Sequence, residues 1–338
     1  MGAGQFSRIA GASNPAAPPG DCEIARPALR SAAMTRGMRT RRPVFVGDVQ
    51  GCADELEELA ERAATELGEG FELWLVGDLV NRGPHSLRVL QRVREWVDAG
   101  RARVVLGNHD LHLLRVAAGL RELSPLDSIG EVLAAPDADE WVEWLRRQPL
   151  ALTGCLGRQP FAMVHASVHP DWGLDELRRR VHRAEARLAS GTRGDAERFL
   201  AGDPHQDPDL DTLLRVTCCR SVGPDGSWSP ELPELAPPGH CAWHREWAAR
   251  RHDYAVVYGH WALQGLHLAP GLRGLDTGCV HHGRGRTGFL TAWLPDPGSA
   301  APFSLPDENF WQIPARRAYY AHRDHVEAAS DPLREKTD

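Results

Sequence analysis

The chain has 338 residues, of which 42% are apolar, and a formal net charge of -7. A chain of this length can hold one catalytic α/β domain of about 250 residues together with tails. It contains no apolar run of about 18 residues, so we expect no membrane-spanning helix. The negative charge argues against general binding along a nucleic-acid backbone, because such binders carry an excess of basic residues.

The two ends of the chain differ in composition from its middle. Residues 1–42 are rich in Ala, Gly, Pro, Ser and Arg, without sustained periodicity, and Met34 and Met38 are alternative starts. The sequence therefore predicts a disordered extension over 1–42, a catalytic domain over 43–319 and a polar tail over 320–338.

The seven cysteines form no C-x-x-C pair. This pattern favours a cytoplasmic protein without a disulfide framework. The run His240-Cys-Ala-Trp-His244 lacks a second ligand pair at finger spacing, so we expect no structural zinc there.

Three consecutive segments share a strand, turn and helix pattern. In each, a short apolar run ends at a glycine and a polar residue: Asp48 after 44–46, Asp78 after 73–76, and Asn108 after 104–106. Helical periodicity follows over 56–67, over 86–97 and up to residue 118. The polar residues lie 30 positions apart twice (78 − 48 and 108 − 78), about the length of a βαβ unit. Since such units give parallel strands with their carboxyl ends at one edge of a sheet, we expect the three side chains to converge.

Later segments extend this pattern. Two further apolar runs, 161–164 and 255–258, end at His165 and at Gly259-His260. Additional strands are expected over 272–275 and 288–293, in a second sheet packed on the first. Helices are expected over 139–147 and 174–189, and loops over the Pro- and Asp-rich segment 191–239. The expected fold is α/β, with two packed mixed β-sheets flanked by helices.

Polar residues at the strand ends supply oxygen and imidazole ligands: Asp48, Asp78, Asn108, His165 and His260. Each alone has an ordinary explanation, because an Asp after a strand often caps a helix and a buried His is often a satisfied polar group. Together they fit two divalent cations about 3.5 to 4 Å apart, which acidify a shared water and clamp phosphoryl oxygens. Glycine precedes four of the five, as expected where backbone approaches an ion closely.

Several ordered motifs carry a family resemblance: Gly47-Asp-Val-Gln-Gly51, Gly77-Asp-Leu-Val-Asn-Arg-Gly-Pro84, Gly107-Asn-His-Asp110, His165 and Gly259-His260. In this order they resemble the calcineurin-like metallophosphoesterases. Further motifs resemble the symmetrical diadenosine tetraphosphatases within that group: Leu106-Gly-Asn-His-Asp-Leu-His-Leu-Leu114, Trp144-Leu-Arg-Arg-Gln-Pro-Leu150, Trp228-Ser-Pro-Glu-Leu232 and Leu275-Asp-Thr-Gly-Cys279. The resemblance covers about residues 44–295.

The resemblance implies a role for individual residues. The first metal would be held by Asp48, Gln50 and Asp78, and the second by Asp78, Asn108, His165 and His260, with Asp78 as the bridge. His109 is implied as the general acid that protonates the leaving oxygen. Arg82 and Arg215 are implied as phosphate clamps, and for Arg215 an ordinary surface role is equally open.

Three positions depart from the pattern of the wider superfamily. Gln50 replaces the usual histidine, which predicts a looser first metal because an amide oxygen binds more weakly than imidazole. Asn81 stands where protein phosphatases of this fold carry an aspartate, so we expect His109 to lack a charged orienting partner. The segment His281-His-Gly-Arg-Gly-Arg286 replaces a tryptophan and glycine pattern and adds basic residues near the expected pocket rim.

The resemblance implies metal-dependent hydrolysis of dinucleoside polyphosphates, with diadenosine tetraphosphate cleaved symmetrically into two ADP. The oxygen-rich ligand set suits Mn²⁺, Co²⁺ or Mg²⁺, with Mn²⁺ favoured. RNA 5′ ends that carry a nucleoside polyphosphate cap present the same bond, and no stable protein partner is expected. Two alternatives stay open: a phosphoprotein or phosphomonoester phosphatase of the same fold, and a catalytically silent nucleotide-binding sensor.

Overall fold

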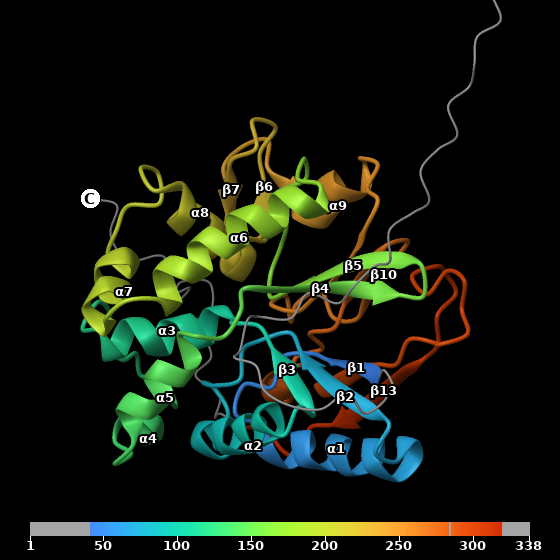
Figure 1. Ribbon diagram of the computed structural model, residues 1–338, viewed down its shortest axis with the longest axis horizontal. Helices are drawn as coiled ribbons and strands as arrows, with labels where there is room; N and C mark the ends of the chain where they lie inside the picture. The colour runs from blue at the N-terminus through green and yellow to red at the C-terminus, as the bar shows by residue number, and fades with distance from the viewer. Residues whose placement is uncertain (1–40, 284, 320–338) are drawn as a thin grey trace, which may run out of the picture.

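The computed structural model describes residues 41–283 and 285–319 (Figure 1). The predicted tail over 320–338 and, apart from its last two residues, the predicted extension over 1–42 lie outside the described residues. Within the described part, no helix has the length and apolar character needed to span a membrane.

The first sheet has five strands in the order β13-β12-β1-β2-β3. They are β1 (Arg42–Val46), β2 (Phe71–Leu75), β3 (Ala102–Val104), β12 (Phe289–Trp293) and β13 (Phe310–Pro314). As their spacing predicted, β1, β2 and β3 are parallel. The expectation that residues 288–293 belong to the second sheet is wrong, because β12 pairs antiparallel with β1. The outer edge of β1 would otherwise present unpaired backbone groups.

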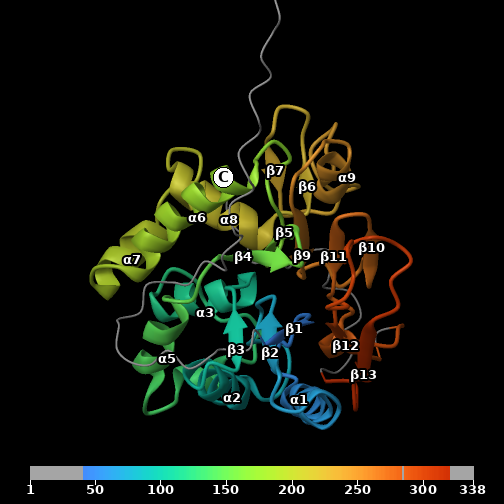
Figure 2. The ribbon, with the colours of Figure 1, turned by 45° about the vertical axis from the view of Figure 1, so that its right-hand side comes forward.

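The second sheet also has five strands, in the order β10-β11-β9-β5-β4, and lies across the first (Figures 1 and 2). They are β4 (Ala151–Leu156), β5 (Gln159–Val164), β9 (Ala255–Tyr258), β10 (His267–Ala269) and β11 (Leu272–Gly274). The pairs β5 with β9 and β9 with β11 are parallel. A small third sheet contains β6 (Ser221–Val222), β7 (Trp228–Ser229) and β8 (Cys241–Ala242).

Alternation along β1 explains how the layers pack. Val44 and Val46 join the large apolar cluster on the helix side, whereas Phe45 joins the cluster between the two sheets. There the Phe45 ring lies 5.4 Å from the ring of Phe161 in β5 and 5.2 Å from that of Trp293 in β12. Successive side chains of a strand point to opposite faces, so a strand with two apolar faces must be covered on both.

Helices α1 (Ala53–Leu67) and α2 (Ser86–Asp98) cover the outer face of the first sheet (Figure 1). The others are α3 (Asn108–Ala117), α4 (Gly130–Leu133), α5 (Ala138–Leu145), α6 (Leu174–Ala189), α7 (Arg193–Leu200), α8 (Pro208–Cys218), α9 (Trp243–Ala248) and the short 3₁₀ helix η1 (Cys279–His281). The helix predicted over 174–189 is confirmed with those bounds.

The prediction of loops over 191–239 is wrong, because this segment contains α7 and α8. The Thr192 side chain accepts a hydrogen bond from the Asp195 N–H at the start of α7. At the start of α8, Asp207 caps the helix and Pro208 occupies its first turn. Asp and Pro, which suggested loops, here mark helix N-termini, where free backbone N–H groups need acceptors and proline loses nothing.

Candidate active site

The carboxyl ends of the strands bring the predicted polar residues together. Asp48 follows β1, Asp78 follows β2, and His165 follows β5 of the second sheet. One ligand atom from each of these three buried residues lies within 4.8 Å of the other two. The sheets thus meet at one edge, where residues distant in sequence form a single cluster.

Asp78 is the most highly connected residue of this cluster. Its Oδ1 accepts a hydrogen bond from the His109 backbone N–H at 2.8 Å and lies 3.3 Å from His165 Nε2. Its Oδ2 accepts a hydrogen bond from Gln50 Nε2 at 3.3 Å. The Asp78 carboxylate thus lies between the other donors, where a ligand that bridges two metal ions must lie.

The two histidines are oriented by backbone carbonyl groups. His165 Nδ1 lies 2.9 Å from the Val76 oxygen, which leaves Nε2 to face Asn108 Oδ1 at 3.0 Å. His260 Nε2 lies 2.9 Å from the Cys218 oxygen, and its Nδ1 lies 2.7 Å from the same Asn108 oxygen. A carbonyl that accepts from one ring nitrogen leaves the other free for a metal.

Close backbone approach explains two of the glycines that precede site residues. A Cβ on Gly107 would lie 2.1 Å from Asp78 Oδ1, and one on Gly259 would lie 2.0 Å from Asp48 Oδ1. Both contacts are far below van der Waals separation. Any larger residue at either position would therefore displace a carboxylate of the cluster.

Backbone strain is concentrated at the same place. Among the described residues, the non-glycine positions with positive φ are Gln50, Asp78, Asn81, Arg82 and His260. Left-handed backbone is costly for such residues and persists where the surrounding structure enforces it, commonly at functional sites.

Sequence reasoning missed Asp276, which follows β11 and is 3% exposed. Burial, and then the charges of Asp276 and Asp78, raise the pKa of Asp48 well above its usual range. Burial also raises the pKa of Asp78 to about 7, where the His109 N–H opposes the shift and Asp276 adds to it. The sequence did contain an indication of Asp276, since this aspartate follows a strand just as Asp48 does.

These carboxylates fit the divalent cations that the motifs imply. Crowded carboxylates out of water repel one another and retain protons unless cations replace them. The neighbouring donors are amide oxygens and imidazole nitrogens, which complete a ligand set suited to Mn²⁺, Co²⁺ or Mg²⁺. The chemistry of the donor set thus agrees with a two-metal centre.

A hydrogen-bond network fixes the ring of His109. The Asn81 side-chain oxygen accepts the backbone N–H of Arg82 at 2.8 Å and that of Ser128 at 3.0 Å. The amide nitrogen must then face the other way, where it lies 3.1 Å from His109 Nδ1 and 2.9 Å from Asp127 Oδ1. Because this nitrogen only donates, Nδ1 accepts, and the ring proton belongs on Nε2. That nitrogen lies 4.0 Å from Asp78 Oδ2 and therefore faces the cluster.

A charged partner is nevertheless present in this network: Asp127 contacts Asn81, which in turn contacts His109. Asp127 Oδ2 lies 2.8 Å from His112 Nε2, and its side chain is 2% exposed. Burial opposes ionisation, but hydrogen bonds from His112, Asn81 and the Ser124 N–H together lower the pKa of Asp127 far below its usual range.

The arginines occupy different surroundings. Arg82 NH1 lies 3.8 Å from Asp127 Oδ1, beside His109. Arg215 is 5% exposed, donates to the Gly226 oxygen at 2.9 Å, and lies over the rings of Trp172 and Trp228 at 5.8 and 6.0 Å.

A third arginine, Arg220, escaped sequence reasoning. It donates to the His260 carbonyl oxygen at 3.3 Å, and its charge acts on Asp78, His165 and Asp276. Arg286, from the basic segment of the sequence analysis, lies beside the same cluster: it donates to the Ala262 oxygen at 2.5 Å, and its charge opposes the raised pKa that burial gives Asp276.

The chain belongs to the calcineurin-like phosphoesterase family, whose sequence model matches residues 41–264. It is 39% identical over 256 residues to the symmetrical bis(5'-nucleosyl)-tetraphosphatase of Ralstonia nicotianae, an alignment that spans 72% of this chain and 87% of that protein. The enzyme of the same name from Burkholderia pseudomallei is 41% identical over 257 residues, spanning 70% of this chain and 86% of the relative.

Among solved structures, the fold is similar to the crystal structure of a candidate diadenosine tetraphosphatase. The TM-score is 0.53 at 25% identity, over 81% of this chain and 94% of the other. The predicted fold class and family are confirmed, and the protein is a hydrolase of the metallophosphoesterase type.

Proposed function

We propose that the protein hydrolyses dinucleoside polyphosphates and cleaves diadenosine tetraphosphate symmetrically into two ADP. The observation that carries this proposal is the convergence of Asp48, Asp78 and His165 within 4.8 Å. It occurs in a chain about 40% identical to enzymes with that activity in their name.

The proposed first metal site consists of Asp48, Gln50 and Asp78, and the second of Asp78, Asn108, His165 and His260. Mn²⁺ is the proposed ion, with Co²⁺ and Mg²⁺ as chemically suitable alternatives. Two such cations, when bound, supply an activated water and neutralise charge on the phosphoryl oxygens. Asp276 adds negative charge beside them and helps to retain them.

His109 is the proposed proton donor to the leaving phosphate oxygen. Burial, and then the charge of Arg82, lower the pKa of His109 well below its usual range, so the ring is neutral at rest with its proton on Nε2. An anionic phosphate beside the ring favours its protonated form and counters this shift. In the neutral ring Asn81 donates to Nδ1, which keeps Nε2 directed at the cluster, and protonation of Nδ1 ends this hydrogen bond.

Arg82 and Arg220 are the proposed phosphate clamps nearest the cluster, since guanidinium groups bind phosphate oxygens through paired N–H donors. Arg215 stays a predicted clamp. Capped RNA 5′ ends are a proposed further substrate that presents the same bond, and the cytoplasmic location expected from the cysteine pattern stays a prediction.

The test is product separation after incubation of metal-free and Mn²⁺-loaded protein with diadenosine tetraphosphate. ADP as sole product, formed only with metal, would support the proposal. ATP with AMP would overturn symmetrical cleavage, and no turnover combined with phosphopeptide hydrolysis would replace it with a phosphoprotein phosphatase. Asp78→Asn serves as the inactive control because it keeps the shape of the carboxylate and removes its charge.

A further inference from the structure

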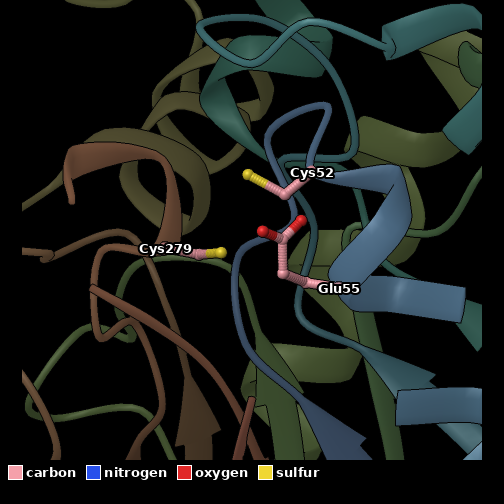
Figure 3. Close-up of side chains that lie close together, drawn as sticks. All are labelled: Cys52, Glu55 and Cys279. Atoms are coloured by element: carbon pink, nitrogen blue, oxygen red, sulfur yellow. The ribbon is translucent and has the colours of Figure 1, made fainter. Parts of the chain in front are cut away.

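A second cluster of metal-binding groups lies outside the catalytic ligand set. It consists of Cys52 at the N-terminus of α1, Glu55 in the first turn of α1, and Cys279 at the start of η1. The two sulfur atoms and a carboxylate oxygen all lie within 4.8 Å of one another. Figure 3 shows that the three side chains, from segments more than 220 residues apart, face a common space.

Only one of the two carboxylate oxygens of Glu55 accepts hydrogen bonds from the described residues. Glu55 is fully buried, and its Oε1 accepts hydrogen bonds from the Arg316 backbone N–H at 2.8 Å and from the Tyr319 hydroxyl. Its Oε2 is buried without a hydrogen-bond partner among the described residues. The Arg316 guanidinium is paired with Glu58. A buried carboxylate oxygen without a partner is costly, and a cation beside it would remove that cost.

The donor types select a different ion from the catalytic centre. Thiolates bind soft ions such as Zn²⁺ or Cd²⁺, whereas carboxylate, amide and water oxygens suit Mn²⁺ and Mg²⁺. The proposed catalytic ligands include no sulfur. Three donors from the chain leave one tetrahedral position for solvent or for a backbone oxygen such as that of Gln50, which lies 3.9 Å from Cys52 Sγ.

We propose that Cys52, Glu55 and Cys279 form a separate binding site for one soft divalent cation of the zinc type. Cys52 is two residues from Gln50, and Cys279 is three residues from Asp276. A bound ion would therefore tie the loop after β1 to η1 and fix the spacing of two segments that border the catalytic cluster. This site is independent of the substrate proposed above.

Cadmium titration of the reduced, metal-free full-length protein tests the site, with the ultraviolet charge-transfer band of cadmium–thiolate bonds as readout. We expect one equivalent of Cd²⁺ to produce a band with the intensity of two thiolates, even when excess Mn²⁺ occupies the catalytic centre. Cys279→Ser should remove one thiolate from the band. Cys219→Ser, which alters a fully buried thiol elsewhere, should leave it intact.

Glu55→Gln tests the third ligand, since it keeps the size of the side chain and the acceptor for Arg316 and Tyr319. We expect about tenfold weaker Cd²⁺ binding with the two-thiolate band retained. A wild-type protein without a thiolate band, or a band that survives in the Cys52→Ser and Cys279→Ser double variant, would overturn the proposal.

Zinc-edge X-ray absorption on wild-type protein loaded with one equivalent of Zn²⁺ after Mn²⁺ saturation gives an answer that needs no variant. Two sulfur ligands at about 2.3 Å are expected, and ligation by nitrogen and oxygen alone would contradict the site. Neither measurement involves turnover, so failure of the proposed hydrolysis and failure of this site can be told apart.

Discussion

Asp127 Oδ1 lies 2.9 Å from the same Asn81 nitrogen that lies 3.1 Å from His109 Nδ1. A neutral amide thus stands between a buried carboxylate and the proposed proton donor. An aspartate at position 81 would accept a hydrogen bond from the Nδ1–H group and stabilise the charged ring. Asn81 instead places the proton of the neutral ring on Nε2, and Asp127 holds the amide in the orientation that achieves this.

Asp127→Asn should lower kcat about tenfold and change KM less, because its hydrogen bond to Asn81 orients His109, whereas its contact with the proposed clamp Arg82 is long, at 3.8 Å. Steady-state rates on diadenosine tetraphosphate at saturating Mn²⁺ measure both constants. Asp225→Asn, at an exposed turn, is the control and should change neither. Equal losses in Mn²⁺ affinity and kcat would show instead that Asp127 supports the metal centre.

Gln50→His should tighten Mn²⁺ binding about tenfold, because imidazole is a stronger ligand than an amide oxygen. The substitution suits the backbone, since Gln50 has φ of 46° and histidine is among the residues enriched in that region. Calorimetric titration of metal-free protein with Mn²⁺ gives the affinity. Gln50→Ala provides the opposite change, and equal affinities for all three proteins would remove Gln50 from the ligand set.

Metal-free protein should lose thermal stability as the pH rises from 7 to 8. Burial raises the pKa of Asp78 to about 7, and burial together with the charge of Asp78 raises that of Asp110 to about 8. The folded state then holds protons that the unfolded chain has already lost, so the free energy of unfolding falls with rising pH across this window. Burial lowers the pKa of His165 to about 4 and those of His109 and His260 well below the usual range. These histidines have the opposite effect on stability up to about pH 7, below which the unfolded histidines still carry protons.

Thermal melts at a series of pH values with and without Mn²⁺ check this dependence. Bound Mn²⁺ should flatten the slope, because cations replace the protons on the carboxylates. Asp78→Asn should flatten it in the metal-free protein for a different reason, the loss of one titrating group. A melting temperature that rises with pH in metal-free protein would refute the assignment.

Arg220→Gln should lower kcat/KM for diadenosine tetraphosphate about 10- to 100-fold, the loss expected for hydrogen bonds to a charged group. Its charge acts on three residues of the cluster, and its guanidinium donates to the Pro230 and His260 carbonyl oxygens, so a check that the variant keeps its fold belongs to the test. Kinetics and circular dichroism together measure both effects.

Arg215→Gln is the matched comparison, because Arg215 is buried and lies over the rings of Trp172 and Trp228. We expect a lower melting temperature and a smaller kinetic effect than for Arg220→Gln. The reverse order, with a kinetic loss concentrated in Arg215→Gln, would make Arg215 the main phosphate clamp.

The sequence by itself determined the parallel strands β1, β2 and β3 and the polar residues at their ends. Both follow from local patterns: short continuous apolar runs, helical periodicity, and a repeat of 30 residues. The glycines before Asn108 and His260 belong to the same class of signal, because each reflects a backbone approach that no side chain allows. These patterns can be recognised in short stretches of sequence without knowledge of the strand order in the sheets.

Only the tertiary structure decided which distant residues join the site. Asp276, Arg220 and Asp127 reach it because two sheets and several loops meet at one edge, and no local period encodes that meeting. Cys52 and Cys279 likewise come together only because β12 pairs with β1 and packs against both α1 and η1. The local sequence determines which helix or strand each segment can form. The packing of the layers determines which charged side chains are buried together, and this proximity sets their pKa values and their chemistry.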